Sequence, residues 1–206
     1  MAKFIKLYEE NPNEKMVSEI VNVLQNGGLI IYPTDTVYGV GCDLHNPKAL
    51  KKLAQLKGVK IEKANFSFIT DSLSNLSEYV SQISTPVYKL LKRTLPGPYT
   101  YIMQGASKLP KPFKNKKTVG IRIPDNAIIK AIVQELGNPI ASTSIKDSDK
   151  IIAYTTDPEI IFSQWQNKVA LIINGGCGGN IASTVIDVSS GEPELIRAGK
   201  GSIDIL

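Results

Sequence analysis

Segments with the periodicity of amphipathic helices alternate with short apolar runs along the 206-residue chain, and this alternation constrains the fold more than any other feature. Between residues 14 and 26, apolar residues recur at the spacing of one helix face, with Asn13 as a suitable N-cap and Gly27 as a suitable stop. The run LIIYP at 29–33 follows directly and ends in proline, which is typical of a buried strand. The alternation predicts an α/β fold.

The same patterns recur to the end of the chain. They predict helices at 47–57, after Thr85-Pro86, at 126–136 and from Asp157-Pro158 onward, and strands near 66–70 and at 99–103, 118–124, 139–143, 169–174, 183–188 and 194–198. The last three strands have no helix between them, which predicts antiparallel pairing and hence a mixed sheet with helices on its faces. Because no linker, repeat or low-complexity run interrupts the pattern, we expect one domain over residues 1–206.

Composition excludes several classes of protein. No apolar run approaches the roughly 18 to 20 residues of a membrane helix, and the N-terminus lacks the pattern of a secretory signal, so we expect a soluble cytoplasmic protein with no membrane association. Two cysteines and one histidine are too few for a disulfide framework or a Cys/His metal site. The formal net charge of +5 favours anionic partners such as nucleotides or RNA.

Polar side chains gather where the predicted strands end, which is where α/β sheets usually bind ligands. Thr34, Asp35 and Thr36 follow the strand at 29–33, Arg122 interrupts an apolar strand, and a run of three hydroxyls occupies 142–144. Each feature alone is equally compatible with a turn, an exposed strand residue or the start of a loop. The Walker and dinucleotide patterns and the serine-hydrolase elbow are all absent.

In their order along the chain, a set of segments resembles the threonylcarbamoyl-AMP synthase family, the YrdC/YciO-like proteins. They are YPTDTVYGVGCD (32–43), KG (57–58), PGPYTYI (96–102), TVGIRIP (118–124), STS (142–144), STVIDVS (183–189) and LIRAGKGS (195–202). The resemblance extends from about residue 15 to the C-terminus. It implies a twisted, open α/β sheet with a positively charged cavity that binds ATP, with Mg²⁺, and L-threonine.

The resemblance also assigns residues to ligands. It implies that threonine is surrounded by Thr36, Arg122, Ser142 and Ser183, and that the adenylate or its phosphates contact Lys57, Thr118, Ser144 and Arg197. In the implied reaction the amine of threonine takes up bicarbonate-derived carbon dioxide, and the carbamate attacks the α-phosphate of ATP to give threonylcarbamoyl-AMP for tRNA A37 modification. The reaction needs no covalent protein catalyst and no metal held by protein ligands, because positioning and charge neutralisation suffice.

Two positions depart from the pattern of the synthases and leave two hypotheses open. The family's synthases carry Lys-x-Arg and Ser-x-Asn pairs, but Val59 stands two residues after Lys57 and Lys146 stands two residues after Ser144. One hypothesis is a YciO-type protein that binds nucleotide and RNA with weak or altered chemistry. The other is an active L-threonylcarbamoyladenylate synthase.

A lysine-rich stretch suggests where RNA would bind. Five lysines occur within ten residues of a proline-containing loop between two predicted strands: Lys108, Lys111, Lys114, Lys116 and Lys117. Such a run is either a solvated surface or a contact to a phosphate backbone. Because no aromatic residues cluster with the lysines, double-stranded or structured RNA is favoured over single strands.

Overall fold

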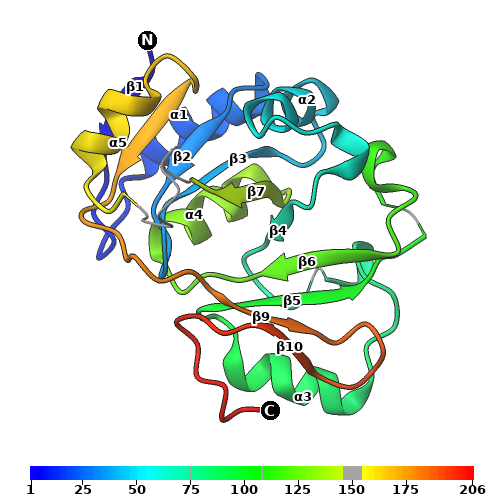
Figure 1. The fold of residues 1–206 in the computed structure, drawn as a ribbon. Coiled ribbons are helices and arrows are strands. Elements are labelled where there is room, and N and C mark those ends of the chain that lie inside the picture. The colour runs from blue at the N-terminus through cyan, green and yellow to red at the C-terminus, as the bar shows by residue number, and fades with distance from the viewer. Residues whose placement is uncertain (75, 108, 146–154) are drawn as a thin grey trace.

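A computed structural model describes residues 1–74, 76–107, 109–145 and 155–206. Within these residues ten strands form one mixed sheet, in the order β1-β8-β2-β3-β7-β4-β6-β5-β9-β10. The strands are β1 (Lys3–Lys6), β2 (Ile30–Tyr32), β3 (Gly39–Asp43), β4 (Ser67–Ile69), β5 (Tyr99–Gln104), β6 (Thr118–Arg122), β7 (Ile140–Ser144), β8 (Leu171–Asn174), β9 (Thr184–Asp187) and β10 (Glu194–Arg197). The sheet twists strongly, and in Figure 1 its two halves lie above and below β4. The expected α/β class and mixed sheet are confirmed.

Five α-helices accompany the sheet in the described part of the chain: α1 (Glu14–Gln25), α2 (Pro47–Leu56), α3 (Thr85–Thr94), α4 (Ala127–Leu136) and α5 (Pro158–Trp165). Their starts follow from local chemistry. The side chains of Asn13, Asn46, Asn126 and Asp157 each accept a hydrogen bond from a backbone N–H of the first helical turn. The three 3₁₀ turns η1 (Ile61–Lys63), η2 (Leu76–Glu78) and η3 (Lys111–Phe113) lie in connections.

Two apolar cores hold the helices to the sheet. α1 and α4 pack together on one face, where Ile20, Leu24, Ile128 and Ile132 are fully buried against strand residues such as Ile30. The larger core lies on the other face and includes the buried side chains of α2, α3 and α5. No helix of the described residues is both long enough and apolar enough to cross a bilayer.

The structure corrects the sequence interpretation at three strands. β1 and β3 were not predicted, because β1 (KFIK) is short and charged and β3 (GVGCD) contains two glycines, so neither has the usual strand pattern. The expected antiparallel pairing of the last three strands holds only for β9 with β10. β8 instead lies parallel to both β1 and β2, because α5 returns the chain to that end of the sheet.

Candidate functional site

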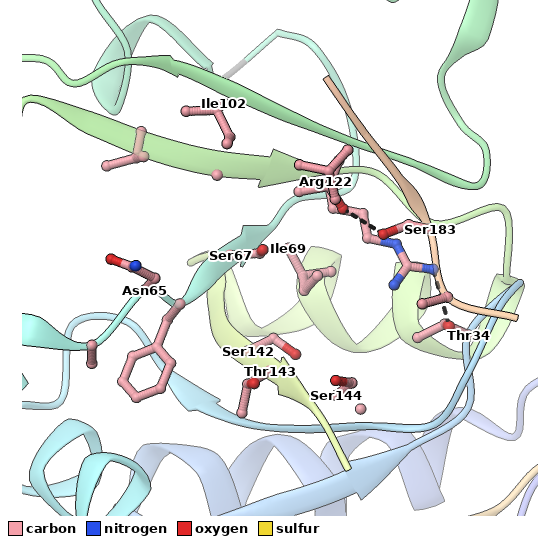
Figure 2. Close-up of a pocket in the computed structure, with 18 of the residues that line it drawn as sticks. Thr34, Asn65, Ser67, Ile69, Ile102, Arg122, Ser142, Thr143, Ser144 and Ser183 are labelled. Carbon is pink, nitrogen blue, oxygen red and sulfur yellow. Dashed lines mark hydrogen bonds between the residues drawn. The ribbon is translucent and has the colours of Figure 1, made fainter. Parts of the chain in front are cut away.

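A cavity of about 500 Å³ lies between the two halves of the sheet. Its walls come from both halves, namely from β3 and β7 on one side and from β5, β6 and β9 on the other, with β4 between them. In Figure 2 the labelled side chains of Ser67, Ser142 and Thr143 lie in the middle of this space. Its volume is within the range of pockets that hold small molecules and nucleotides.

Arg122, the last residue of β6, forms one end of the cavity with the segment after β2. Its Nη2 donates to Thr34 Oγ1 at 3.1 Å, to Thr36 Oγ1 at 2.5 Å and to Asp35 Oδ1 at 2.5 Å. Thr34 Oγ1 in turn donates to Val37 O at 2.7 Å, which fixes the turn after Pro33. The guanidinium is therefore held in one orientation by residues from a distant part of the sequence.

The ion pair between Arg122 and Asp35 is largely buried. The side chains of Arg122 and Asp35 are only 10% and 9% exposed. Within the described residues, Asp35 Oδ2 and Arg122 Nε are buried without a hydrogen-bond partner. Of the two residues, only Arg122 lines the cavity, so its guanidinium is the group of this pair that a ligand would meet.

A side-chain hydrogen bond between Tyr32 of β2 and Ser142 of β7 lies at the floor of the cavity. Burial raises the pKa of Tyr32 above its ordinary range, so the phenol stays protonated and donates to Ser142 Oγ. Ser142 lies opposite Gly41 in the pairing of β3 with β7, and its side chain is almost fully buried. The hydroxyl of Ser144, two residues on, lines the same cavity.

Ser183, which directly precedes β9, Thr100 of β5 and Arg197 of β10 supply the remaining polar groups at the Arg122 end. Ser183 Oγ lies 2.8 Å from Thr100 Oγ1, and Arg197 Nη2 donates to Ser183 O at 2.7 Å. The view in Figure 2 places Ser183 and Thr34 on the same side of the cavity as Arg122. This end therefore combines two guanidinium groups with several hydroxyls.

The opposite end carries lysines. Lys57 follows the end of α2 and lines the cavity, as do Asn65, Lys116 and Thr118. Lys116 Nζ donates to Asn65 Oδ1 at 2.8 Å. Figure 2 shows Asn65 across the cavity from Arg122, so cations stand at both ends of the space.

The structure brings the residues assigned by the resemblance into one place. Arg122, Ser142, Ser183, Lys57, Thr118, Ser144 and Arg197 all line the cavity. Thr36 is fully buried behind the lining and contacts it through Arg122. The resemblance assigned no role to Asn65, nor to Tyr32 and Thr100, although the last two lie in its segments 32–43 and 96–102.

The lysine-rich stretch divides into two groups. Lys111, Lys114 and Lys117 are exposed, whereas Lys116 is half-buried and turned into the cavity. Lys108 lies outside the described residues, as does Lys146. The five lysines predicted as one RNA surface therefore do not all face the same way.

No carboxylate is among the described residues that line the cavity, and no group of His, Cys, Asp or Glu in the described ranges could hold a metal ion. A Mg²⁺ ion in this space would find only hydroxyl and amide oxygens on the protein. It fits the site as an ion carried on the phosphates of a nucleotide, since Mg²⁺ is commonly bound in that way.

Comparison with known proteins identifies the family model and the relatives that the chain matches. A family model named Sua5_yciO_yrdC and described as "Telomere recombination" matches residues 22–199. The uncharacterised protein YciO of Escherichia coli (strain K12) is 32% identical over 205 residues, 98% of each chain. The crystal structure of E. coli YciO superposes with a TM-score of 0.90 at 31% identity and covers 100% of this chain and 99% of that one.

Relatives with known ligands or activities are also similar. The threonylcarbamoyl-AMP synthase of Vibrio parahaemolyticus is 33% identical over 164 residues, 78% of this chain and 87% of the synthase. The structure of P. abyssi Sua5 complexed with L-threonine superposes with a TM-score of 0.85 at 27% identity over 95% of this chain. This chain spans only 57% of that longer protein.

The resemblance seen in the sequence is thus confirmed by the family model, by the sequence relatives and by the similar solved structures. The segment 22–199 contains the Thr34–Thr36 turn, Arg122 and the three hydroxyls of β7, which together line or support the cavity. The chain belongs to the Sua5/YciO/YrdC family, and it matches the E. coli YciO protein over 98% of that protein's length.

Proposed function

We propose that the chain is a YciO-type nucleotide-binding protein whose cavity holds ATP, with its Mg²⁺, beside a small amino acid such as L-threonine. The observation that carries the proposal is the cavity itself, which has hydroxyls along its floor and cations at both ends. Hydroxyls and cations recognise carboxylates and phosphates without a covalent step. The likeness to a Sua5 structure with L-threonine supports the amino acid as second ligand.

The proposed roles divide the residues that line or support the cavity between the two ligands, and Arg197, which donates to Ser183 O, stands where the two ligands meet. Thr36, Arg122, Ser142 and Ser183 would surround the amino acid, because Arg122 Nε is buried without a partner among the described residues and is a ready donor to a carboxylate. Lys57, Thr118, Ser144 and Arg197 would contact the nucleotide and its phosphates. Mg²⁺ would neutralise phosphate charge and would be held chiefly by the nucleotide.

We expect the synthase reaction to be slow in this chain. In that reaction the threonine carbamate oxygen forms a bond to the α-phosphorus of ATP, and the bond to pyrophosphate breaks. Val59 occupies the position of a phosphate-facing arginine in the synthases and is 42% exposed. Loss of one such cation costs on the order of 10² to 10³ in rate when nothing replaces it.

The second candidate is an active L-threonylcarbamoyladenylate synthase that uses L-threonine, bicarbonate and ATP. The observation that favours it is the intact Arg122 end, where the guanidinium is already fixed by Thr34, Asp35 and Thr36. Preorganised donors of this kind need little rearrangement when the ligand arrives.

One experiment separates the two candidates. The purified protein is incubated with Mg-ATP, bicarbonate and each of several amino acids, and pyrophosphate and adenylate products are measured beside the V. parahaemolyticus synthase. Calorimetry measures ATP binding in parallel. ATP binding with pyrophosphate release at least about 100-fold below the reference supports the YciO-type function. Release at a similar rate that requires both threonine and bicarbonate supports the synthase, and absence of ATP binding contradicts both.

A matched pair of variants tests the amino-acid end. Ser183→Ala removes a buried cavity hydroxyl, whereas Ser190→Ala removes an exposed hydroxyl in the turn after β9. We expect Ser183→Ala to weaken threonine binding about 5- to 10-fold, as expected for one lost hydrogen bond, and Ser190→Ala to leave it unchanged. Equal affinity in both variants would remove Ser183 from the proposed site.

The exposed lysines Lys111, Lys114 and Lys117 form the proposed RNA surface, together with Lys108 by its position in the sequence. They stand in the connection between β5 and β6, next to the cavity that Lys116 lines. Ammonium groups spaced along such a loop fit a phosphate backbone, and affinity for it falls steeply with salt.

The salt dependence of RNA binding tests this surface. Replacing Lys111, Lys114 and Lys117 together by alanine should lower the slope of log affinity against log salt by about 2 to 3. The control replaces three exposed helical lysines, Lys48, Lys51 and Lys89, and should leave the slope unchanged. An RNA interaction that is absent or insensitive to salt, or that responds equally to both triple variants, would contradict the surface.

A further inference from the structure

We infer that Lys116 binds the β- and γ-phosphates of the nucleotide and does not belong to the RNA surface formed by its neighbours. The inference rests on the proposed binding of ATP in the cavity. In this role Lys116 receives the polyphosphate, although the sequence grouped it with the lysines that were predicted to bind RNA. The contacts of Lys116, its position just before β6 and its electrostatic surroundings all point to this role.

Lys116 continues a row of cavity-facing positions. Thr118, Gly120 and Arg122 alternate along β6, and all three line the cavity. Lys116 stands two residues before Thr118 and lines it too. At about 3.3 Å per residue, Thr118 and Arg122 are roughly 13 Å apart along the strand, and Lys116 lies beyond Thr118, before the strand begins. That length suits a ligand with anionic groups at both ends.

The side chain is anchored at the end away from Arg122. Lys116 Nζ donates to Asn65 Oδ1 at 2.8 Å, and Figure 2 shows Asn65 across the cavity from Arg122. Nearby, the rings of Phe66 and Phe113 meet edge to face with centroids 6.5 Å apart, which holds the two connections together. Lys116 is therefore positioned by its neighbours, unlike Lys117, which is exposed.

The charge of Lys116 is not neutralised by the described part of the protein. Its hydrogen-bond partner is a neutral amide, and it takes part in no ion pair with a described carboxylate. Arg122, by contrast, is paired with Asp35. A half-buried ammonium with spare donors in a cavity that has no described carboxylate is suited to phosphate oxygens. Lys116 can thus supply a cation to the cavity, which the apolar Val59 does not.

The test compares the affinities of Mg-ATP and AMP, measured by calorimetry, in four forms of the protein. They are the wild type, Lys116→Met, Lys116→Arg and Lys117→Met. The last removes the same charge from the adjacent exposed residue. We expect Lys116→Met to weaken ATP binding about 10- to 100-fold, since a charge-assisted contact is lost, and to change AMP binding less than about twofold. Lys116→Arg should keep the preference for ATP, and Lys117→Met should resemble the wild type.

Each other outcome overturns the inference in a distinguishable way. If Lys116→Met binds ATP as the wild type does, or weakens ATP and AMP equally, Lys116 does not contact the polyphosphate, while ATP binding by the wild type still supports the proposed function. If the wild type binds neither nucleotide, both the inference and the proposed function fail. Equal losses in Lys116→Met and Lys117→Met would reveal a general charge effect. Thermal unfolding of all four forms identifies any variant that fails to fold.

Discussion

Arg122 and Asp35 are a pair of opposite charges that the fold places inside the molecule. Removing such groups from water costs free energy that only close pairing and hydrogen bonding offset. Arg122 was visible in the sequence because a charge in an apolar strand is unusual. Lys116 was not distinguishable from its neighbours, because its contact with Asn65, a residue 51 positions away along the chain, forms only in the fold.

The first prediction concerns this pair. Asp35→Asn keeps the shape of the side chain but leaves the Arg122 guanidinium without its counter-charge, and we expect the free energy of unfolding to fall by about 3 kcal/mol. Urea unfolding measures the change. The double variant Asp35→Asn/Arg122→Met should recover part of the loss, because no uncompensated charge remains. A single variant as stable as the wild type would show that the pair contributes little to folding.

Helices were easier to predict than strands because their signals are local. The caps Asn13, Asn46 and Asp157 act within the first turn, and each was predicted from the sequence and is confirmed in the structure. β3 was missed because its side chains carry no alternating pattern, and glycines are common in loops. Its strand geometry comes from pairing with β2 and β7 on either side.

The second prediction concerns the contact between β3 and β7. A Cβ added at Gly41 would lie 2.5 Å from Ile140 Cγ2 and 2.8 Å from Ala141 O, so the strands would have to separate. We expect Gly41→Ala to lower the free energy of unfolding by about 1–3 kcal/mol in a denaturant titration.

Gly120→Ala is the matched control in β6. Its added Cβ would meet Ser67 Oγ at 3.1 Å, the end of a small side chain. We expect a smaller loss of stability, below about 1 kcal/mol, together with weaker nucleotide binding, because Gly120 lines the cavity. If both variants unfold at the same denaturant concentration, close approach of β3 and β7 is not what requires glycine at position 41.

At the scale of the whole molecule, the sequence predicted the class of fold but not the order of the strands. β8 and β9 are consecutive in sequence, yet the sheet places β8 between β1 and β2 and β9 between β5 and β10. Strand order depends on which apolar faces meet after long-range folding, and local patterns do not encode it. The make-up of the cavity also depends on the strand order, since its residues come from strands far apart in the chain. The family resemblance named eight residues before the pairing was known, and seven of them line the cavity.

The third prediction follows from phenols buried throughout the molecule. Burial raises the pKa of Tyr38, Tyr79 and Tyr101 from 10.0 to about 12. Between these values the folded protein keeps its phenolic protons while the unfolded chain releases them. Stability is therefore unaffected by these groups below pH 10 and falls as the pH rises through 12.

Urea unfolding at a series of pH values, followed beside phenolate absorbance, measures this decline. Tyr101→Phe provides the control, since it removes one of the titrating groups. The variant loses the contact between Tyr101 Oη and Thr94 Oγ1, which are 2.8 Å apart, and should be less stable than the wild type at neutral pH. Above pH 10 its stability should fall less steeply, because one fewer proton is released on unfolding. Parallel curves for the two proteins would show that Tyr101 ionises equally easily in the folded and unfolded states, contrary to its burial.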